Sequence, residues 1–177
     1  LMYTLNEKVV YPGHGVAKVK QVIEKSVGAT TVKFYELKFL NKDMTILIPV
    51  KSDACCIRPL STEQNIERMF EVLSEPTVKR NCVLSSWNKR NKQYQYKIKT
   101  GDILEISKIY RDLQCMSKEK DLSFGEKNLL NQTEALLVEE ISAVKNLVEE
   151  QAIQTLRAIF MGIHSATHNN HASTTHI

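Results

Sequence analysis

The sequence predicts an α+β fold, with a small antiparallel β-sheet or barrel in residues 1–60 and a compact all-helical domain in residues 61–160. Two observations support this division. Residues 1–60 alternate short β-rich runs with turns, at a spacing typical of small antiparallel sheets. Residues 61–160 repeat apolar side chains at the three- and four-residue spacing of amphipathic helices. A length of 177 residues is enough for one large domain or two small ones.

The expected strands occupy four short runs. Residues 9–11 end at the Pro-Gly-His-Gly turn of residues 12–15, where glycine accepts a positive φ. Residues 16–23 and 31–40 alternate roughly between apolar and polar side chains, and residues 44–50 form a last β-rich run. A sheet of this size has a small core.

Five helices are expected in residues 61–160, the last after a weak break near Asn146. The helix starts are marked, in order, by a Ser61/Gln64 capping box, by Ser85 or Ser86, by Asp102 and by a Ser123/Glu126 capping box. Gly101 is expected to end the second helix. The apolar stripes predict a shared core of Ile66, Met69, Phe70, Leu73, Ile103, Ile106, Ile109, Tyr110, Leu113, Leu129, Leu130, Leu136, Leu137, Ile141, Ala152, Ile153, Leu156, Ile159 and Phe160.

Residues 161–177 are rich in His, Thr, Asn and Ser, and we expect a disordered tail there. The alternative is a metal site formed by its irregularly spaced histidines, His164, His168, His171 and His176. The four cysteines show no paired ligand spacing, and we expect small apolar fillers or inert thiols at Cys55, Cys56, Cys82 and Cys115. No cofactor is expected.

The motifs of common enzyme classes are missing from the sequence. It has no glycine-rich phosphate loop and no HExxH motif, and His14 is the only histidine outside the tail. It also has no apolar run of roughly 18 residues, the length a membrane span needs, and no signal pattern at its first residues. We therefore expect a cytoplasmic protein that is not an enzyme.

Residues 77–101 carry seven Lys or Arg and no Asp or Glu, with the single tryptophan, Trp87, among them. Such cations gain free energy when they meet a polyanion and release its counterions. A flat aromatic side chain can stack on bases or wedge between them. We expect Trp87 to be exposed, because it lies in the first turn of a helix. The alternative is a solvated helix face with one buried anchor tryptophan.

Short motifs follow one another in a fixed order along residues 3–160. They are VVYPGHGV at 9–16, MTILIPV at 44–50, IRPL at 57–60, SWNKR at 86–90, TGD at 100–102, IYRDL at 109–113 and LSFGEK at 122–127. Taken together, these motifs resemble the CarD/CdnL family of bacterial transcription regulators.

The resemblance implies a Tudor-like bent sheet that docks on the β subunit of RNA polymerase, and a helical domain that contacts promoter DNA without sequence specificity. The contact lies at the upstream edge of the melted region, where the tryptophan matching Trp87 wedges into the minor groove and the open complex is stabilised. Leu47 stands where some members carry a basic residue, which would weaken the ionic part of docking. We expect a monomer in the bacterial cytoplasm, associated with the nucleoid through polymerase.

The expected contact residues form two groups. Those facing DNA are Lys79, Arg80, Trp87, Lys89, Arg90, Lys92 and Lys97. Those facing polymerase are Lys25, Val27, Ile46, Leu47, Ile48 and Pro49. Two other functions remain open: a stand-alone architectural DNA-binding protein whose sheet forms a dimer surface, and an adaptor whose Trp87 and cations dock an acidic protein.

Overall fold

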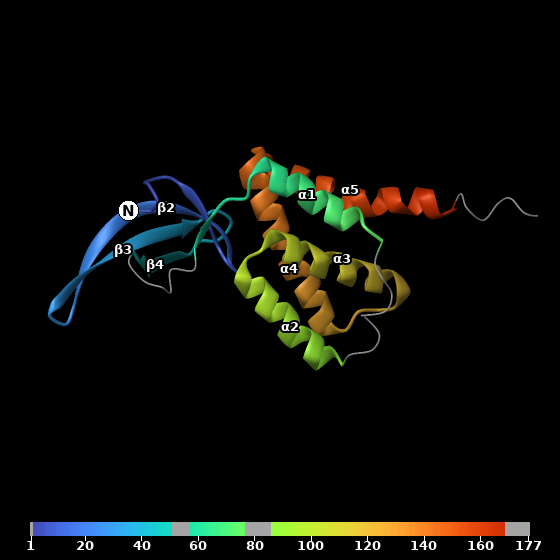
Figure 1. The fold of residues 1–177 in the computed structure, drawn as a ribbon, viewed down its shortest axis with the longest axis horizontal. Helices are drawn as coiled ribbons and strands as arrows, with labels where there is room; N and C mark the ends of the chain where they lie inside the picture. Colours follow the sequence, from blue (N-terminus) through green and yellow to red (C-terminus); the bar gives the residue numbers. More distant parts are fainter. Residues whose placement is uncertain (1, 51–56, 77–85, 169–177) are drawn as a thin grey trace, which may run out of the picture.

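The computed structural model describes residues 2–50, 57–76 and 86–168, with the backbone alone described for 162–168. Figure 1 shows a twisted sheet on one side and a bundle of helices on the other. This arrangement confirms the predicted α+β fold. No helix in the described part of the chain is long and apolar enough to cross a membrane.

The sheet has five antiparallel strands in the order β4-β3-β2-β1-β5. It is a bent sheet with β4 and β5 at its two edges, and a long β2–β3 hairpin extends from it (Figure 1). A bulge between Val19 and Gln21 interrupts the pairing of β2 with β3. The strands are β1 (Lys8–Tyr11), β2 (Gly15–Val27), β3 (Thr30–Phe39), β4 (Thr45–Pro49) and β5 (Arg58–Pro59).

The five predicted helices are all present, and the N-caps predicted for the third and fourth are confirmed. Ser86 holds the N-cap position of the second helix, but its side chain makes no capping hydrogen bond, and Gly101 ends that helix as predicted. Asp102 accepts a hydrogen bond from Leu104 N–H, and Ser123 and Glu126 form a complete capping box. The Ser61 cap is wrong, because Thr62 caps the first helix and Ser61 N–H donates to Glu140 instead. The helices are α1 (Glu63–Ser74), α2 (Trp87–Thr100), α3 (Ile103–Glu119), α4 (Phe124–Lys145) and α5 (Glu149–His168).

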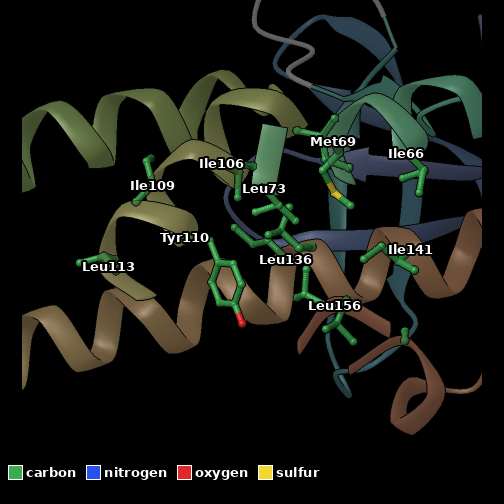
Figure 2. Close-up of a cluster of buried hydrophobic side chains, with 14 of the residues drawn as sticks. Ile66, Met69, Leu73, Ile106, Ile109, Tyr110, Leu113, Leu136, Ile141 and Leu156 are labelled. Atoms are coloured by element: carbon green, nitrogen blue, oxygen red, sulfur yellow. The ribbon is translucent and has the colours of Figure 1, made fainter. Parts of the chain in front are cut away.

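The helical core is built around α4, which packs against α1, α3 and α5. Figure 2 shows side chains from these helices meeting in one cluster, among them Met69, Tyr110 and Leu156. Most of the predicted core residues are buried. The exceptions are partly buried at the margin of the cluster: Phe70, Leu130, Ile153 and Ile159.

The last helix is longer than predicted. α5 continues to His168, so the expected tail over residues 161–177 is wrong for 161–168. The apolar periodicity ends near Phe160, but backbone hydrogen bonds can continue a helix beyond its packed face. The predicted tail from 169 onward lies outside the described residues.

An ion pair joins the sheet to α4. Arg58 donates to both carboxylate oxygens of Glu140, at 2.7 and 2.8 Å, and Arg58 Nε donates to the Gly101 carbonyl at 2.8 Å. Glu140 also accepts from Ser61 N–H at 2.9 Å and is only 4% exposed at its side chain. This two-pronged contact fixes the position of the sheet relative to the helices.

Two glycines let the domains approach closely at the same junction. Gly15 has φ +107°, and a Cβ there would overlap the carboxylate of Glu139, which accepts from Val16 N–H at 2.9 Å. Gly101 has φ +73°, and a Cβ there would lie 2.7 Å from Pro12 Cγ. Burial raises the pKa of Glu139 despite the Val16 hydrogen bond. The Pro-Gly-His-Gly and Thr-Gly-Asp motifs therefore serve the contact between domains.

Candidate nucleic-acid and partner interfaces

The outer side of α2 presents a row of cations. Lys89, Lys92, Tyr96 and Lys99 follow one another at three- and four-residue spacing, so they share one face of the helix. All four are exposed, Tyr96 to 73%. We call them the α2 basic face. Lys89 and Lys92 were predicted to contact DNA, whereas Tyr96 and Lys99, which share their face of the helix, were not among the predicted contacts.

Trp87 is partly buried, so the expectation of an exposed side chain is wrong. Its indole packs against the margin of the helical core and over the first turn of α4. A Cβ added to Gly125 would lie 3.0 Å from Trp87 Cζ2 and 3.2 Å from Nε1. Part of the ring is therefore structural, and the remainder lies at the surface beside the start of α2.

Arg90 is held in an ion pair and has little exposed surface. Its Nη2 lies 2.9 Å from Glu126 Oε1, and the two side chains are 11% and 3% exposed. Burial opposes ionisation of Glu126, but hydrogen bonds from Ser123 and Lys120 lower its pKa below the ordinary value. Arg90 thus joins the start of α2 to the start of α4, so its side chain has a structural role besides the DNA contact that the sequence predicted.

Arg90→Ala should lower the free energy of unfolding by about 2 kcal/mol, because a charged hydrogen bond to a buried carboxylate is lost. Lys92→Ala on the same helix should change it by less than about 0.5 kcal/mol. Urea unfolding of both variants measures the difference. Equal stabilities would show that the Arg90–Glu126 pair contributes nothing.

Of the remaining predicted DNA contacts, the structure describes Lys97 alone. Lys97 forms an ion pair with Glu105 at 2.7 Å, and Glu105 also binds Lys108 at 2.6 Å. These two lysines lower the pKa of Glu105. Lys97 is thereby partly neutralised and less available to DNA. Lys79 and Arg80 lie outside the described residues.

The side chains of β4 alternate between the sheet core and solvent. Ile48 is buried and Ile46 partly buried against the core, whereas Leu47 is 37% exposed. Ile46 and Ile48 were predicted to contact polymerase, but their side chains pack into the core of the sheet. Leu47 is the outward-facing member of the three.

The backbone of β4 has the opposite alternation. Backbone hydrogen bonds to β3 at the two ends of this strand show which of its residues bond to β3 and which do not. The backbone N–H and C=O groups of Ile46 and Ile48 bond to β3. Those of Thr45 and Leu47 point toward the outer edge of the sheet. Pro49 has no N–H, so it limits pairing at its end of that edge. Among the described residues, β4 pairs with β3 alone.

Lys25 and Val27 lie away from the β4 edge. Lys25 pairs with Val32, and Val27 pairs with Thr30 at the end of the β2–β3 hairpin. β3 lies between this strand and β4. The structure therefore places the predicted polymerase contacts on two parts of the sheet. One is β4, and the other is the far half of β2, which pairs with β3 but not with β1.

The described residues contain no group of three His, Cys, Asp or Glu side chains arranged to hold a metal ion. Cys115 is partly buried. The other three cysteines lie outside the described part of the chain.

Comparisons with known proteins match both parts of the chain. Residues 3–61 match the family model described as the CarD-like/TRCF RID domain, and residues 68–157 match the model described as the CarD C-terminal domain. Over 151 residues the chain is 30% identical to a Bacillus subtilis (strain 168) protein named "Putative transcription factor YdeB". That alignment covers 85% of this chain and 97% of the relative.

Proposed function

The chain belongs to the CarD family of transcription regulators, and we propose that it docks on the β subunit of RNA polymerase and stabilises the open promoter complex. One observation carries this proposal. The chain carries both an open strand edge, β4, and an exposed row of cations, the α2 basic face. The Arg58–Glu140 ion pair joins the two domains and so fixes the position of one surface relative to the other. The proposed division is residues 1–60 for docking and 61–160 for DNA contact.

Docking would occur by addition of a polymerase strand to β4. An exposed strand edge supplies main-chain hydrogen bonds, and outward side chains supply selectivity. Thr45 and Leu47 offer the backbone groups, and Leu47 offers the side chain. Since Leu47 is apolar, this contact would depend on packing rather than on an ion pair.

Leu47→Asp should weaken binding to RNA polymerase by about tenfold or more, since it places a charge in an apolar contact. Leu47 is exposed, so the variant should fold normally, unlike a charge at Ile46. Val148→Asp is a matched control, because Val148 is 63% exposed in the helical domain. Binding to purified polymerase by titration would test this. Retention of full affinity by Leu47→Asp would locate the docking surface elsewhere.

DNA contact would use the α2 basic face. Lysines that contact phosphates position a protein on DNA without reading its sequence. The first turn of α2 has no acidic residue, and the positive end of the helix dipole adds to the field of Lys89. The partly exposed Trp87 lies at this end of the helix.

Lys89→Ala combined with Lys92→Ala should weaken DNA binding equally across unrelated sequences. The slope of log affinity against log salt should fall by about one unit for each lost phosphate contact. Lys18→Ala combined with Lys38→Ala removes the same charge from an exposed cross-strand pair on the sheet and should leave the slope unchanged. A sequence-selective loss would instead make the α2 lysines base readers.

The two contacts would act together. Docking raises the local concentration of the helical domain at the promoter, so weak non-specific DNA binding becomes significant. Stabilisation of the open state requires a contact that prefers melted DNA over duplex. The α2 basic face also suits a stand-alone DNA-binding protein, which would bind free duplex equally well with and without polymerase in the same salt titration.

A further inference from the structure

We infer that Phe124 is a second aromatic contact to unpaired bases, beside Trp87, an inference that rests on the proposed function. Phe124 is 81% exposed, more than any other large apolar side chain in the described residues. Single exposed apolar residues are common on proteins. The position of this one, at the junction of two helix starts, gives it a specific use.

The neighbourhood of Phe124 is rigid. The Ser123/Glu126 capping box fixes the first turn of α4, and Glu126 binds Arg90 from the first turn of α2. The next residue, Gly125, lies directly beneath the indole of Trp87. Phe124 is therefore the residue before the one that contacts Trp87. The interactions that fix its backbone do not involve its own ring, so the ring is left exposed.

The charges around Phe124 favour a nucleic acid over an apolar peptide. Lys127 lies one turn along α4 on the same side, and Lys120 precedes the helix, bound to Glu126 but 54% exposed. Asp121 is the acidic side chain of the same connection. Lys89, two residues after Trp87 in α2, is a further exposed cation.

The chemistry of the partner follows from this combination. Every base has a flat π-face that stacks on an aromatic ring, without regard to sequence. Bases expose those faces where a duplex is melted. Trp87, anchored by its packing, and Phe124, with a free ring, would together hold the edge of a melted segment while lysines contact its phosphates.

Open-complex lifetime measured on RNA polymerase with the full-length protein tests this inference. Phe124→Ala should shorten the lifetime by about fivefold or more, the effect of losing one stacked base. Phe124→Tyr keeps the ring and should restore it. Val148→Ala, which removes an exposed apolar side chain elsewhere, should have no effect. Unchanged melting temperatures would exclude a folding effect.

Photocrosslinking from p-benzoylphenylalanine at position 124 gives a second readout. A crosslink to promoter DNA at the upstream edge of the melted region supports the inference. A crosslink to a polymerase subunit alone, or an unchanged lifetime for Phe124→Ala while Trp87→Ala shortens it, overturns this inference and leaves the proposed function intact. If neither aromatic affects the lifetime, the proposed DNA contact itself is wrong.

Discussion

Arg58→Ala should lower the free energy of unfolding by about 3–5 kcal/mol, because it breaks an ion pair to a buried carboxylate. The change leaves the buried Glu140 carboxylate, 4% exposed, without its charged partner, while the Ser61 N–H still donates to it. It also removes the hydrogen bond from Arg58 Nε to the Gly101 carbonyl. The substitution therefore loosens the junction that positions the sheet on α4. Urea unfolding measures the loss.

Two further variants test the geometry of this pair. Arg58→Lys keeps the charge but not the two-pronged contact, so its stability should fall between the wild type and Arg58→Ala. Arg68→Ala removes an exposed arginine from α1 and should change stability by less than about 0.5 kcal/mol. If Arg58→Ala is no less stable than Arg68→Ala, the ion pair does not hold the domains together.

Trp87→Ala should have two separate effects. Because the indole is partly buried against α4, stability should fall by about 1–3 kcal/mol, less than the 3–5 kcal/mol of a fully buried tryptophan. Because the exposed part of the ring meets DNA in the proposed complex, the open-complex lifetime should fall by about fivefold or more. Binding to polymerase should be unchanged.

A matched variant separates these effects. Ile153→Ala removes a partly buried side chain from α5, away from α2, and should lower stability by a similar amount without shortening the lifetime. Equal open-complex lifetimes for Trp87→Ala and Ile153→Ala would show that Trp87 has a structural role only.

Local signals in the sequence were sufficient to predict where α3 begins and where α4 begins and ends. Asp102 caps α3, the Ser123/Glu126 box opens α4, and Asn146 ends α4 in the left-handed conformation, because each acts on backbone groups within a few residues. The apolar stripes likewise predicted which side chains meet in the core. Gly162 and the polar residues after it suggested a tail, although α5 continues to His168.

The charge pattern could not show which cations are neutralised. Residues 77–101 contain no acidic side chain, yet Arg90 pairs with Glu126 and Lys97 with Glu105, both from other helices. Such partners are set by tertiary packing rather than by local sequence. The basic run therefore gave no sign that two of its cations, Arg90 and Lys97, are paired with carboxylates.

The β4 run was ambiguous for a different reason. Ile46, Leu47 and Ile48 are all apolar, so the sequence carries no alternation to show which face is buried. The register with β3 resolves this and leaves Leu47 outside. In the same way, the sequence predicted a turn around Gly15 and a helix end at Gly101, and only the fold shows that both glycines bring two domains into contact.

The central claim is that DNA stabilisation by α2 depends on docking by β4. The most direct test is the open-complex lifetime with four proteins at limiting concentration: wild type, Leu47→Asp, Trp87→Ala and the double variant. We predict that Leu47→Asp alone reduces the lifetime to the value without the protein, and that adding Trp87→Ala then changes nothing further. Independent, multiplicative losses, or full stabilisation by Leu47→Asp, would contradict the account.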